Sequence, residues 1–260
     1  MSIRAFLKPL AAVAVVVLAM AADAGAQGAR RGLQAFGDSL PAPGLSVTFD
    51  EGAACPPIAS PYGSASRYDG SARTTGGAEG AHGGIDLTLA EGTALRSGAP
   101  GRVFAAGEGG MMEGIFLWTL HLPQDTRLGF PFLAKYQHLR EPSLLRPGET
   151  VRLGQAIARS GKSGTVGGHY GPAGYAHLHL TVRLLTPEGA QRAAAGAGEF
   201  RLLRDSIIVD PLTIYVPGLR VPAEAAALPR DRKMLKVASV DADGRPRPAD
   251  ALSVWPVACR

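Results

Sequence analysis

Four of the six histidines in this 260-residue chain lie in contexts that could support chemistry. His177 and His179 flank Leu178 in an apolar stretch, and residues two apart in a strand project from the same face. The two imidazoles would then lie side by side, which suits a divalent metal ion. The spacing does not say which of the two would bind the metal.

A second pair, His82 and Asp86, lies four residues apart in the run AHGGID. In a straight strand their Cα atoms would be about 13 Å apart, whereas both donor atoms must come within about 2 Å of a shared zinc ion. The chain between them therefore has to bend, and we expect Gly83 and Gly84 to allow it through backbone angles closed to other residues. Two histidines and one carboxylate leave one zinc coordination position for water, as in a catalytic site.

Each of these patterns has a simpler interpretation. A single histidine in a strand is more often a core or surface residue than a ligand, and His-x-x-x-Asp alone is a weak motif. The metal-site prediction depends on both patterns occurring together with a further apolar-flanked histidine, His138. His169 lies in a glycine-rich stretch that could shape a substrate groove, act as a lid or be an inert loop.

The rest of the chain favours an all-β fold. Closely spaced runs with Gly and Pro turns predict antiparallel strands in a sandwich-like domain over residues 81–216. A further short strand is expected at residues 45–49, a hairpin around residues 241–244, and an alanine-rich helical segment at residues 187–198. The domain strands are expected at residues 102–106, 115–122, 132–139, 155–159 and 176–185.

Irregular extensions are expected on both sides of this domain. Residues 1–26 have the basic start, short apolar core and small-residue cleavage site of a signal peptide. The apolar run is too short for a transmembrane helix, so we expect cleavage, no stable membrane span and a periplasmic or secreted protein. Residues 27–80 then form an N-terminal extension, irregular over 56–80, and residues 217–260 a C-terminal one.

Charge and cysteine content narrow the possibilities further. Removal of Arg4, Lys8 and Asp23 with the signal peptide takes the net charge from +5 to +4. This weak, dispersed positive charge argues against nucleic acid as a partner but would favour residence near an anionic polymer. The two cysteines, Cys55 and Cys259, show no metal-ligand spacing. In an oxidising compartment we expect them to form a disulfide that joins the two ends of the folded region.

Five motifs occur in the order found in the M23 peptidases, the lysostaphin-like or LytM-domain family: HGGID, GTALRSGAPGRV, YQHL, VRLGQAIARSGKSG and HLHLTV. The resemblance covers about residues 61–215. It implies an all-β domain with an open groove and zinc bound by His82, Asp86 and His179. His177 and His138 then match the two catalytic histidines of the family that do not bind the metal. We expect His177, which its strand holds next to the metal, to be the general base, and His138 to orient water or stabilise the oxyanion. The family often has a histidine that is not a ligand at the position of His121, so we expect a structural role for it. The implied activity is hydrolysis of peptide cross-links in bacterial peptidoglycan.

Other functions remain open at this point. A non-catalytic LytM-like regulator of other wall hydrolases would be expected to lack part of the metal set, whereas every position is filled here. A cupin also uses His-x-His, but the glutamate that should follow is absent. A metal-free binding sandwich would leave the histidines unexplained. Residues before Ala81 could also block the groove as a self-inhibitory segment.

Overall fold

The structure is a computed structural model that describes residues 39–67, 70, 72–73, 81–110, 113–164, 175–198 and 200–260. The chain divides into two units, Met1–Gly37 and Asp38–Arg260, and everything below concerns the second. The predicted signal peptide and His169 lie outside the described residues. Within them, no helix combines the length and apolar character needed to cross a bilayer.

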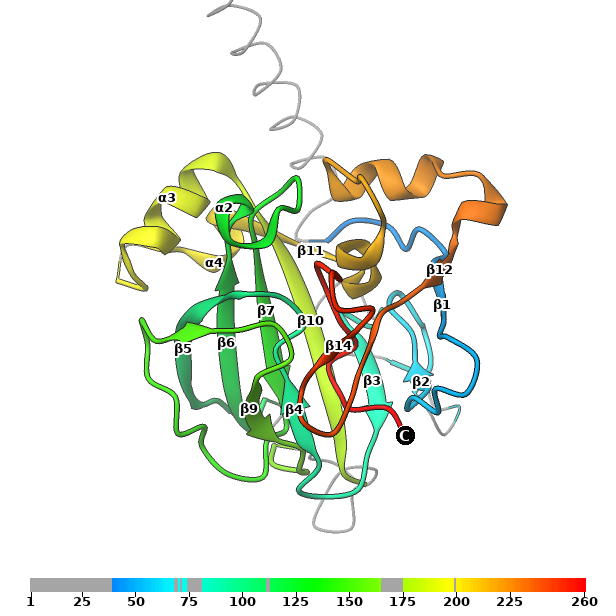
Figure 1. The fold of residues 1–260 in the computed structure, drawn as a ribbon. Helices are drawn as coiled ribbons and strands as arrows, with labels where there is room; N and C mark the ends of the chain where they lie inside the picture. The colour runs from blue at the N-terminus through cyan, green and yellow to red at the C-terminus, as the bar shows by residue number, and fades with distance from the viewer. Residues whose placement is uncertain are drawn as a thin grey trace, which may run out of the picture. The chain divides into compact units, whose positions relative to one another are not determined.

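One eight-stranded sheet dominates the structure, with the order β2-β3-β10-β7-β6-β5-β8 and with β11 paired to β10 (Figure 1). Every pairing in this sheet is antiparallel. Its strands are β2 (Ile58–Ser60), β3 (Ile85–Thr88), β5 (Gly101–Glu108), β6 (Ile115–His121), β7 (Phe132–Gln137), β8 (Thr150–Val151), β10 (His177–Leu185) and β11 (Ser206–Val209).

Three two-stranded pairings and several short helices complete the described elements. β4 (Ala94–Arg96) pairs with β9 (Ala156–Arg159), β13 (Ser239–Val240) with β14 (Pro246–Arg247), and β1 (Ser46–Thr48) runs parallel to β12 (Met234–Lys236). The helices are α2 (Pro123–Thr126), α3 (Pro187–Ala195), α4 (Leu202–Asp205), and the 3₁₀ turns η2 (Pro211–Tyr215), η3 (Pro222–Ala227) and η4 (Arg230–Arg232).

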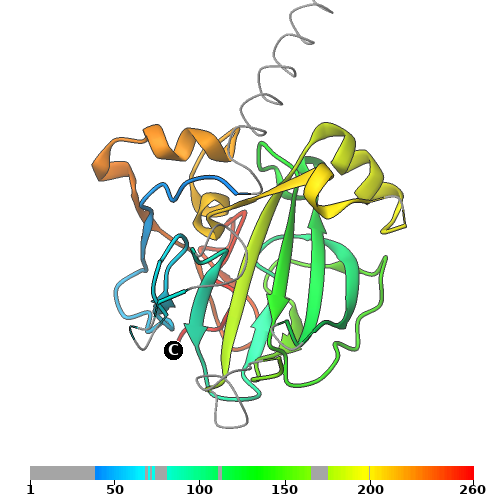
Figure 2. The ribbon, with the colours of Figure 1, turned by 180° about the vertical axis from the view of Figure 1, so that it is seen from behind.

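Strand β10 is central to the sheet, with β3 and β11 on one side and β7 on the other (Figure 2). Its even-numbered side chains, including Leu178 and Leu180, are buried in the apolar core. The odd-numbered positions His177, His179 and Thr181 project from the opposite face, because strand residues alternate between faces. The alternation in HLHLTV therefore gives one strand both a core face and a polar face.

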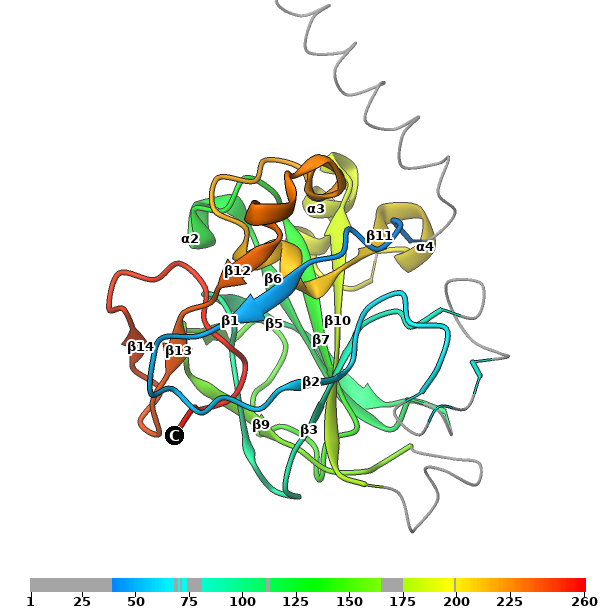
Figure 3. The same cartoon turned by 90° about the vertical axis from the view of Figure 1, so that its right-hand side faces the viewer.

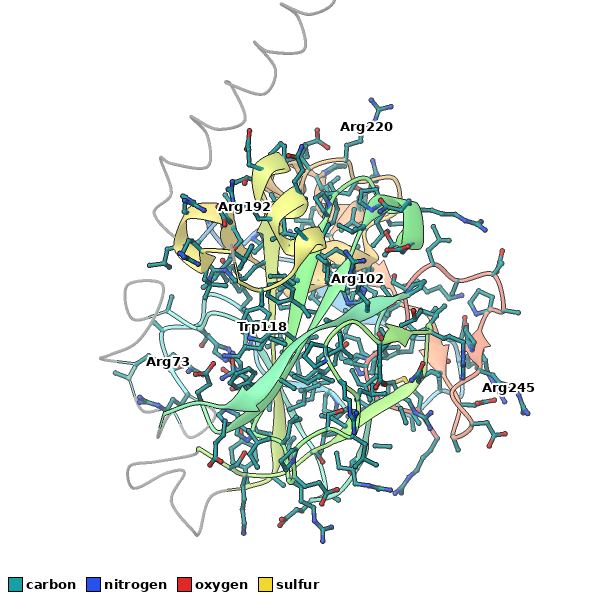
Figure 4. All side chains as sticks on the ribbon, turned by 90° about the vertical axis from the view of Figure 1, so that its left-hand side faces the viewer. Arg73, Arg102, Trp118, Arg192, Arg220 and Arg245 are labelled. Atoms are coloured by element: carbon teal, nitrogen blue, oxygen red, sulfur yellow. A yellow bond between two sulfur atoms is a disulfide. The ribbon has the colours of Figure 1, made fainter. Side chains whose placement is uncertain are left out.

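The end of β10 remote from the histidines is covered by helices. Thr186 caps α3 by accepting a hydrogen bond from the Gly189 amide at 2.9 Å, and Pro187 occupies the first turn, where it loses no helical hydrogen bond. Helix α3 contributes Ala193 to an apolar cluster whose other members are Trp118, Leu120, Leu122, Leu133, Leu185 and Phe200. Figure 4 labels Trp118 of the sheet and Arg192 of α3. The other end of β10, which carries His177 and His179, is the location of the candidate site.

The predicted all-β fold with antiparallel sheets is confirmed, as are the five domain strands, the strand at residues 45–49, the hairpin and the helical segment. Residues 56–80 were expected to be irregular or wrapping segments, but this stretch also contains β2, which joins the edge of the main sheet beside β3 (Figure 3). The composition was misleading because an edge strand of three residues needs backbone pairing on one side only. β3, β4, β8, β11 and β12, each of four residues or fewer, were not predicted as strands, because so short a run carries little periodic signal.

The C-terminal segment is joined to the rest of the fold by packing and by a covalent bond. Trp255 is fully buried, and Val257 forms a bridge with Leu95. The predicted Cys55–Cys259 disulfide is present and connects residues 204 positions apart. A disulfide is typical of proteins that fold in an oxidising compartment.

Because this disulfide closes a loop of 204 residues, we expect its removal to lower the free energy of unfolding by about 5 kcal/mol in the chain-entropy model. Urea unfolding of the wild-type protein and of a Cys55→Ser/Cys259→Ser variant measures the difference. A reductant should destabilise only the wild type. Equal stability of the two proteins under oxidising conditions would contradict the prediction.

Candidate metal centre

His82, Asp86 and His179 converge at the polar end of β10. His82 Nε2 lies 3.1 Å from His179 Nδ1 and 3.2 Å from Asp86 Oδ1. The distance between His179 Nδ1 and Asp86 Oδ1 is 2.8 Å. Within the part of the chain that the structure describes, these three side chains form a group that could hold a metal ion. The first two residues are buried and the third is partly buried.

Sheet register and a bend bring the three residues together. Asp86 of β3 lies directly opposite His179 of β10 in the antiparallel ladder. His82 precedes β3, and its backbone is held by hydrogen bonds to Ser64 O at 3.0 Å and from Gly63 N at 2.8 Å. The predicted bend between His82 and Asp86 is therefore present.

The expected reason for this bend is wrong. Neither Gly83 nor Gly84 has a positive φ angle, so the bend does not use a left-handed backbone conformation that only glycine adopts easily. A Cβ atom on Gly84 would lie 2.3 Å from Leu180 O and 2.9 Å from His179 Nε2. Glycine is needed at position 84 because the neighbouring strand passes too close for any side chain.

The hydrogen bonds of the two imidazoles fix which nitrogen faces the centre. His82 Nδ1 lies 3.0 Å from Pro61 O, and a carbonyl oxygen can only accept, so Nδ1 carries the proton and Nε2 carries the lone pair. His179 Nε2 lies 3.0 Å from Thr181 Oγ1, which leaves Nδ1 toward Asp86. Metal-binding histidines commonly have their second nitrogen held in this way.

The chemistry and spacing of the three atoms fit zinc. Imidazole nitrogen and carboxylate oxygen are common zinc ligands, and tetrahedral bonds of about 2.0–2.1 Å place ligand atoms roughly 3.3 Å apart. The observed separations of 2.8–3.2 Å are slightly shorter than this. Three protein ligands of this kind leave a fourth position open, which is the feature that separates catalytic from structural zinc sites.

Two further histidines lie beside this group. The ring centroids of His138 and His177 are 4.6 Å apart, and those of His138 and His179 are 6.0 Å apart. His177 Nδ1 donates to Tyr175 O at 3.1 Å, and His138 Nδ1 donates to Ser163 O at 2.8 Å. In both neutral rings Nε2 is therefore the nitrogen that can accept a proton.

The backbone of His138 is in the left-handed region, with φ of 61°. This conformation is uncommon for a residue with a side chain and persists only where the surroundings hold it. Ser163 helps to restrain this conformation. Its Oγ accepts a hydrogen bond from Ile115 N at 3.0 Å and donates one at 2.7 Å to the carbonyl of Leu139, the residue after His138.

Burial controls the protonation of the site. It lowers the pKa of His138 to about 3, with the charges of His177 and His179 acting in the same direction. Burial also lowers the pKa values of His177 and His179. For Asp86 burial alone would raise the pKa, but the interactions of the carboxylate with the neighbouring His179 and His82 outweigh it and hold the pKa well below its usual range. Neutral imidazoles and an ionised carboxylate are the forms that bind metal and accept protons.

His121 lies on the other face of the sheet. Its ring stacks on Phe132, with centroids 4.5 Å apart, and its nitrogens lie 2.8 Å from Thr119 Oγ1 and 2.8 Å from Pro100 O. Both nitrogens are satisfied within the core, in agreement with the predicted structural role.

Three residues with contacts to the centre were not predicted from the sequence. Thr181 could have been found, because it lies two residues after His179 and so shares its face of the strand. Ser60 and Arg73 gave no signal, because only the tertiary fold brings them to His82 and Asp86.

An antiparallel β domain with a His-Asp-His group and two further buried histidines suits a metal-dependent hydrolase. Residues 80–192 match the model of peptidase family M23, so the predicted resemblance to that family is confirmed. The family consists of metallopeptidases. A comparison with the curated proteins found no match.

Several solved structures are similar to this chain. The catalytic domain of the antimicrobial peptidase lysostaphin from Staphylococcus simulans is 23% identical, with 48% of this chain and 77% of that chain covered and a TM-score of 0.36. LytU is 18% identical, with 68% and 96% covered and a TM-score of 0.40. A mutant catalytic domain of the prophage-encoded M23 protein EnpA from Enterococcus faecalis is 19% identical, with 54% and 87% covered and a TM-score of 0.36. The resemblance to family M23 rests on the match over residues 80–192.

The burial of His121 predicts a pH dependence of stability. Desolvation lowers its pKa from 6.5 to about 4 in the folded protein, partly offset by the hydrogen bond to Pro100. Between these values the unfolded chain binds more protons, so this contribution is complete above pH 6.5 and is lost as the pH falls toward 4. Its full size is roughly 3 kcal/mol at 1.36 kcal/mol per unit.

Urea unfolding of the wild type and of His121→Gln, both kept metal-free with a chelator, tests this effect. Glutamine can keep hydrogen bonds to Thr119 and Pro100 but does not titrate. The variant should lose less stability than the wild type between pH 6.5 and pH 4. Parallel curves for the two proteins would contradict the prediction.

Proposed function

We propose that this protein is a zinc-dependent endopeptidase that hydrolyses peptide cross-links in bacterial peptidoglycan. The observation that carries the proposal is the convergence of His82 Nε2, Asp86 Oδ1 and His179 Nδ1 within 3.2 Å of one another, beside two buried neutral histidines. The family match over residues 80–192 supports the same class of reaction.

His82, Asp86 and His179 would hold the zinc ion. When bound, zinc supplies Lewis acidity, which polarises the scissile carbonyl and makes water acidic enough to be deprotonated near neutral pH. The hydrogen bonds at His82 Nδ1 and His179 Nε2 keep both rings in the orientation that presents the other nitrogen to the ion.

His177 is the general base in this scheme. Strand β10 fixes its position two residues from His179, and the ring stacks on Tyr175 with centroids 4.6 Å apart. Because Nδ1 donates to Tyr175 O, Nε2 accepts the proton from the attacking water and later returns it to the leaving amine nitrogen. Burial lowers the pKa of His177, which keeps the ring neutral and able to accept a proton.

His138 orients the attacking water. Its Nδ1 proton is committed to Ser163 O, so the neutral ring offers Nε2 only as an acceptor. Donation to an oxyanion would need the imidazolium form, which its pKa of about 3 disfavours. Of the two roles expected for His138, these contacts therefore favour water orientation.

Peptidoglycan as substrate is supported by the family and by features outside the site. M23 peptidases act on peptidoglycan peptides, and the net charge of +5 would favour residence near an anionic wall. The disulfide and the signal-like residues 1–26 fit a protein exported to the periplasm or secreted.

Mass spectrometry of products from defined muropeptides, combined with elemental analysis, tests the function directly. We expect one zinc ion per chain and release of peptide fragments, with activity lost on chelation and restored by zinc. Bound zinc without cleavage of any cross-link would point to another substrate. Absence of both would favour the non-catalytic regulator.

Two single substitutions should separate metal binding from proton transfer. His179→Ala removes a ligand and should abolish stoichiometric zinc binding together with activity. His177→Ala should keep zinc but reduce kcat about 10²- to 10⁴-fold, the usual range for loss of a general base. Zinc content and kcat of both purified variants check this, and wild-type hydrolysis by either would contradict the assignment.

A further inference from the structure

The described residues of the segment 60–73, which precedes the M23-matched region, contact the metal centre on the side of His82 and Asp86 that faces away from the other ligands. Strand β2 pairs with β3 so that Ser60 lies opposite Asp86. Ser60 Oγ lies 3.2 Å from His82 Nδ1, and the next residue, Pro61, accepts the Nδ1 proton at 3.0 Å. Ser60 is 2% exposed, so these contacts are made away from competing water.

Arg73 links the same segment to the carboxylate. Its Nη2 atom donates to Ser60 Oγ at 2.9 Å and lies 3.5 Å from Asp86 Oδ2, and its side chain is 16% exposed. Its Nε atom also donates to Ser66 O at 3.3 Å, which anchors the guanidinium within its own turn. Figure 4 labels this residue.

Ser60, Pro61 and Arg73 each contact a candidate metal ligand through the ligand's outer atom, which faces away from the metal centre. Ser60 and Pro61 reach Nδ1 of His82, whereas Nε2 faces the other ligands. Arg73 reaches Oδ2 of Asp86, whereas Oδ1 faces the two imidazoles. A segment that blocked the site would instead contact the ligand atoms or their open side.

We propose that Ser60, Pro61 and Arg73, which precede the M23-matched residues, form the outer shell of the metal centre and act as positioning residues for His82 and Asp86. This inference rests on the proposed function to the extent that zinc is the bound metal. The described part of the N-terminal extension then supports the catalytic centre, and a self-inhibitory role for it is not supported.

The residues have distinct tasks. The Pro61 carbonyl selects the His82 tautomer with its lone pair on Nε2, and Ser60 holds the plane of the ring. Arg73 occupies Oδ2 of Asp86, so the carboxylate offers the metal a single oxygen. Outer partners of this kind usually contribute 10- to 100-fold to metal affinity.

Ser60→Ala is the main test, with Ser66→Ala as its matched control. Ser66 is an exposed serine six positions further along the chain, and its substitution keeps the backbone carbonyl that accepts from Arg73. Competition with a chromophoric chelator gives the zinc dissociation constant of each protein. We expect Ser60→Ala to raise it about tenfold and Ser66→Ala to leave it unchanged. The melting temperature of the metal-free variants shows whether the fold is intact.

The role of Arg73 is tested spectroscopically, because it has two opposing effects on zinc affinity. Its contact with Asp86 positions a ligand, whereas its positive charge repels the metal cation. Co²⁺ takes the same nitrogen and oxygen ligands and reports their geometry through its visible absorption. Arg73→Met should change the spectrum of the Co²⁺-loaded protein. Arg67→Met, which removes an equal charge from the same turn, should not.

Equal zinc affinity of Ser60→Ala and wild type, or an unchanged Co²⁺ spectrum in Arg73→Met, would overturn the corresponding part of the proposal. A rise in hydrolytic rate in Ser60→Ala would instead support self-inhibition. Zinc affinity is measured without substrate, so wild type that binds zinc but cleaves nothing refutes the proposed function alone. Wild type that binds no zinc refutes both.

Discussion

The cross-strand pair between Asp86 and His179 is the contact on which the rest of the site depends. Antiparallel register places the two residues directly opposite each other, and their side chains project from the same face of the sheet. A shift of one residue in either strand would turn one of them into the apolar core. The core contacts of Leu178, Leu180 and Leu87 therefore fix the register, and through it the chemistry.

His82 comes to this pair from outside the regular ladder, and two sets of contacts hold it. Its backbone bonds to residues 63 and 64, and its ring bonds to Ser60 and Pro61. Gly84 allows the close approach of β10 at the same point. A segment outside the family match is therefore part of the architecture that surrounds the site. The Cys55–Cys259 disulfide ties the start of that segment to the C-terminus.

The sequence predicted the fold class and the strands longer than four residues well, because alternation over such runs is a strong signal. It also brought out the five histidine and aspartate positions, through His-x-His spacing and the family motifs. It did not predict β2, since three residues in a Pro- and Ser-rich stretch have no periodicity to read. The reason given for the double glycine was wrong because interstrand distance, which decides the matter at Gly84, cannot be read from local composition. Ser60 and Arg73 were missed for a related reason, as their partners are defined only by long-range packing.

The central claim is that His82, Asp86 and His179 bind one zinc ion, and anomalous scattering tests it most directly. Crystals of zinc-loaded protein, measured at the zinc absorption edge, should give one strong peak about 2.0–2.2 Å from His82 Nε2, Asp86 Oδ1 and His179 Nδ1. A peak bonded to His177 in place of His179, or no peak between these three side chains, would contradict the account.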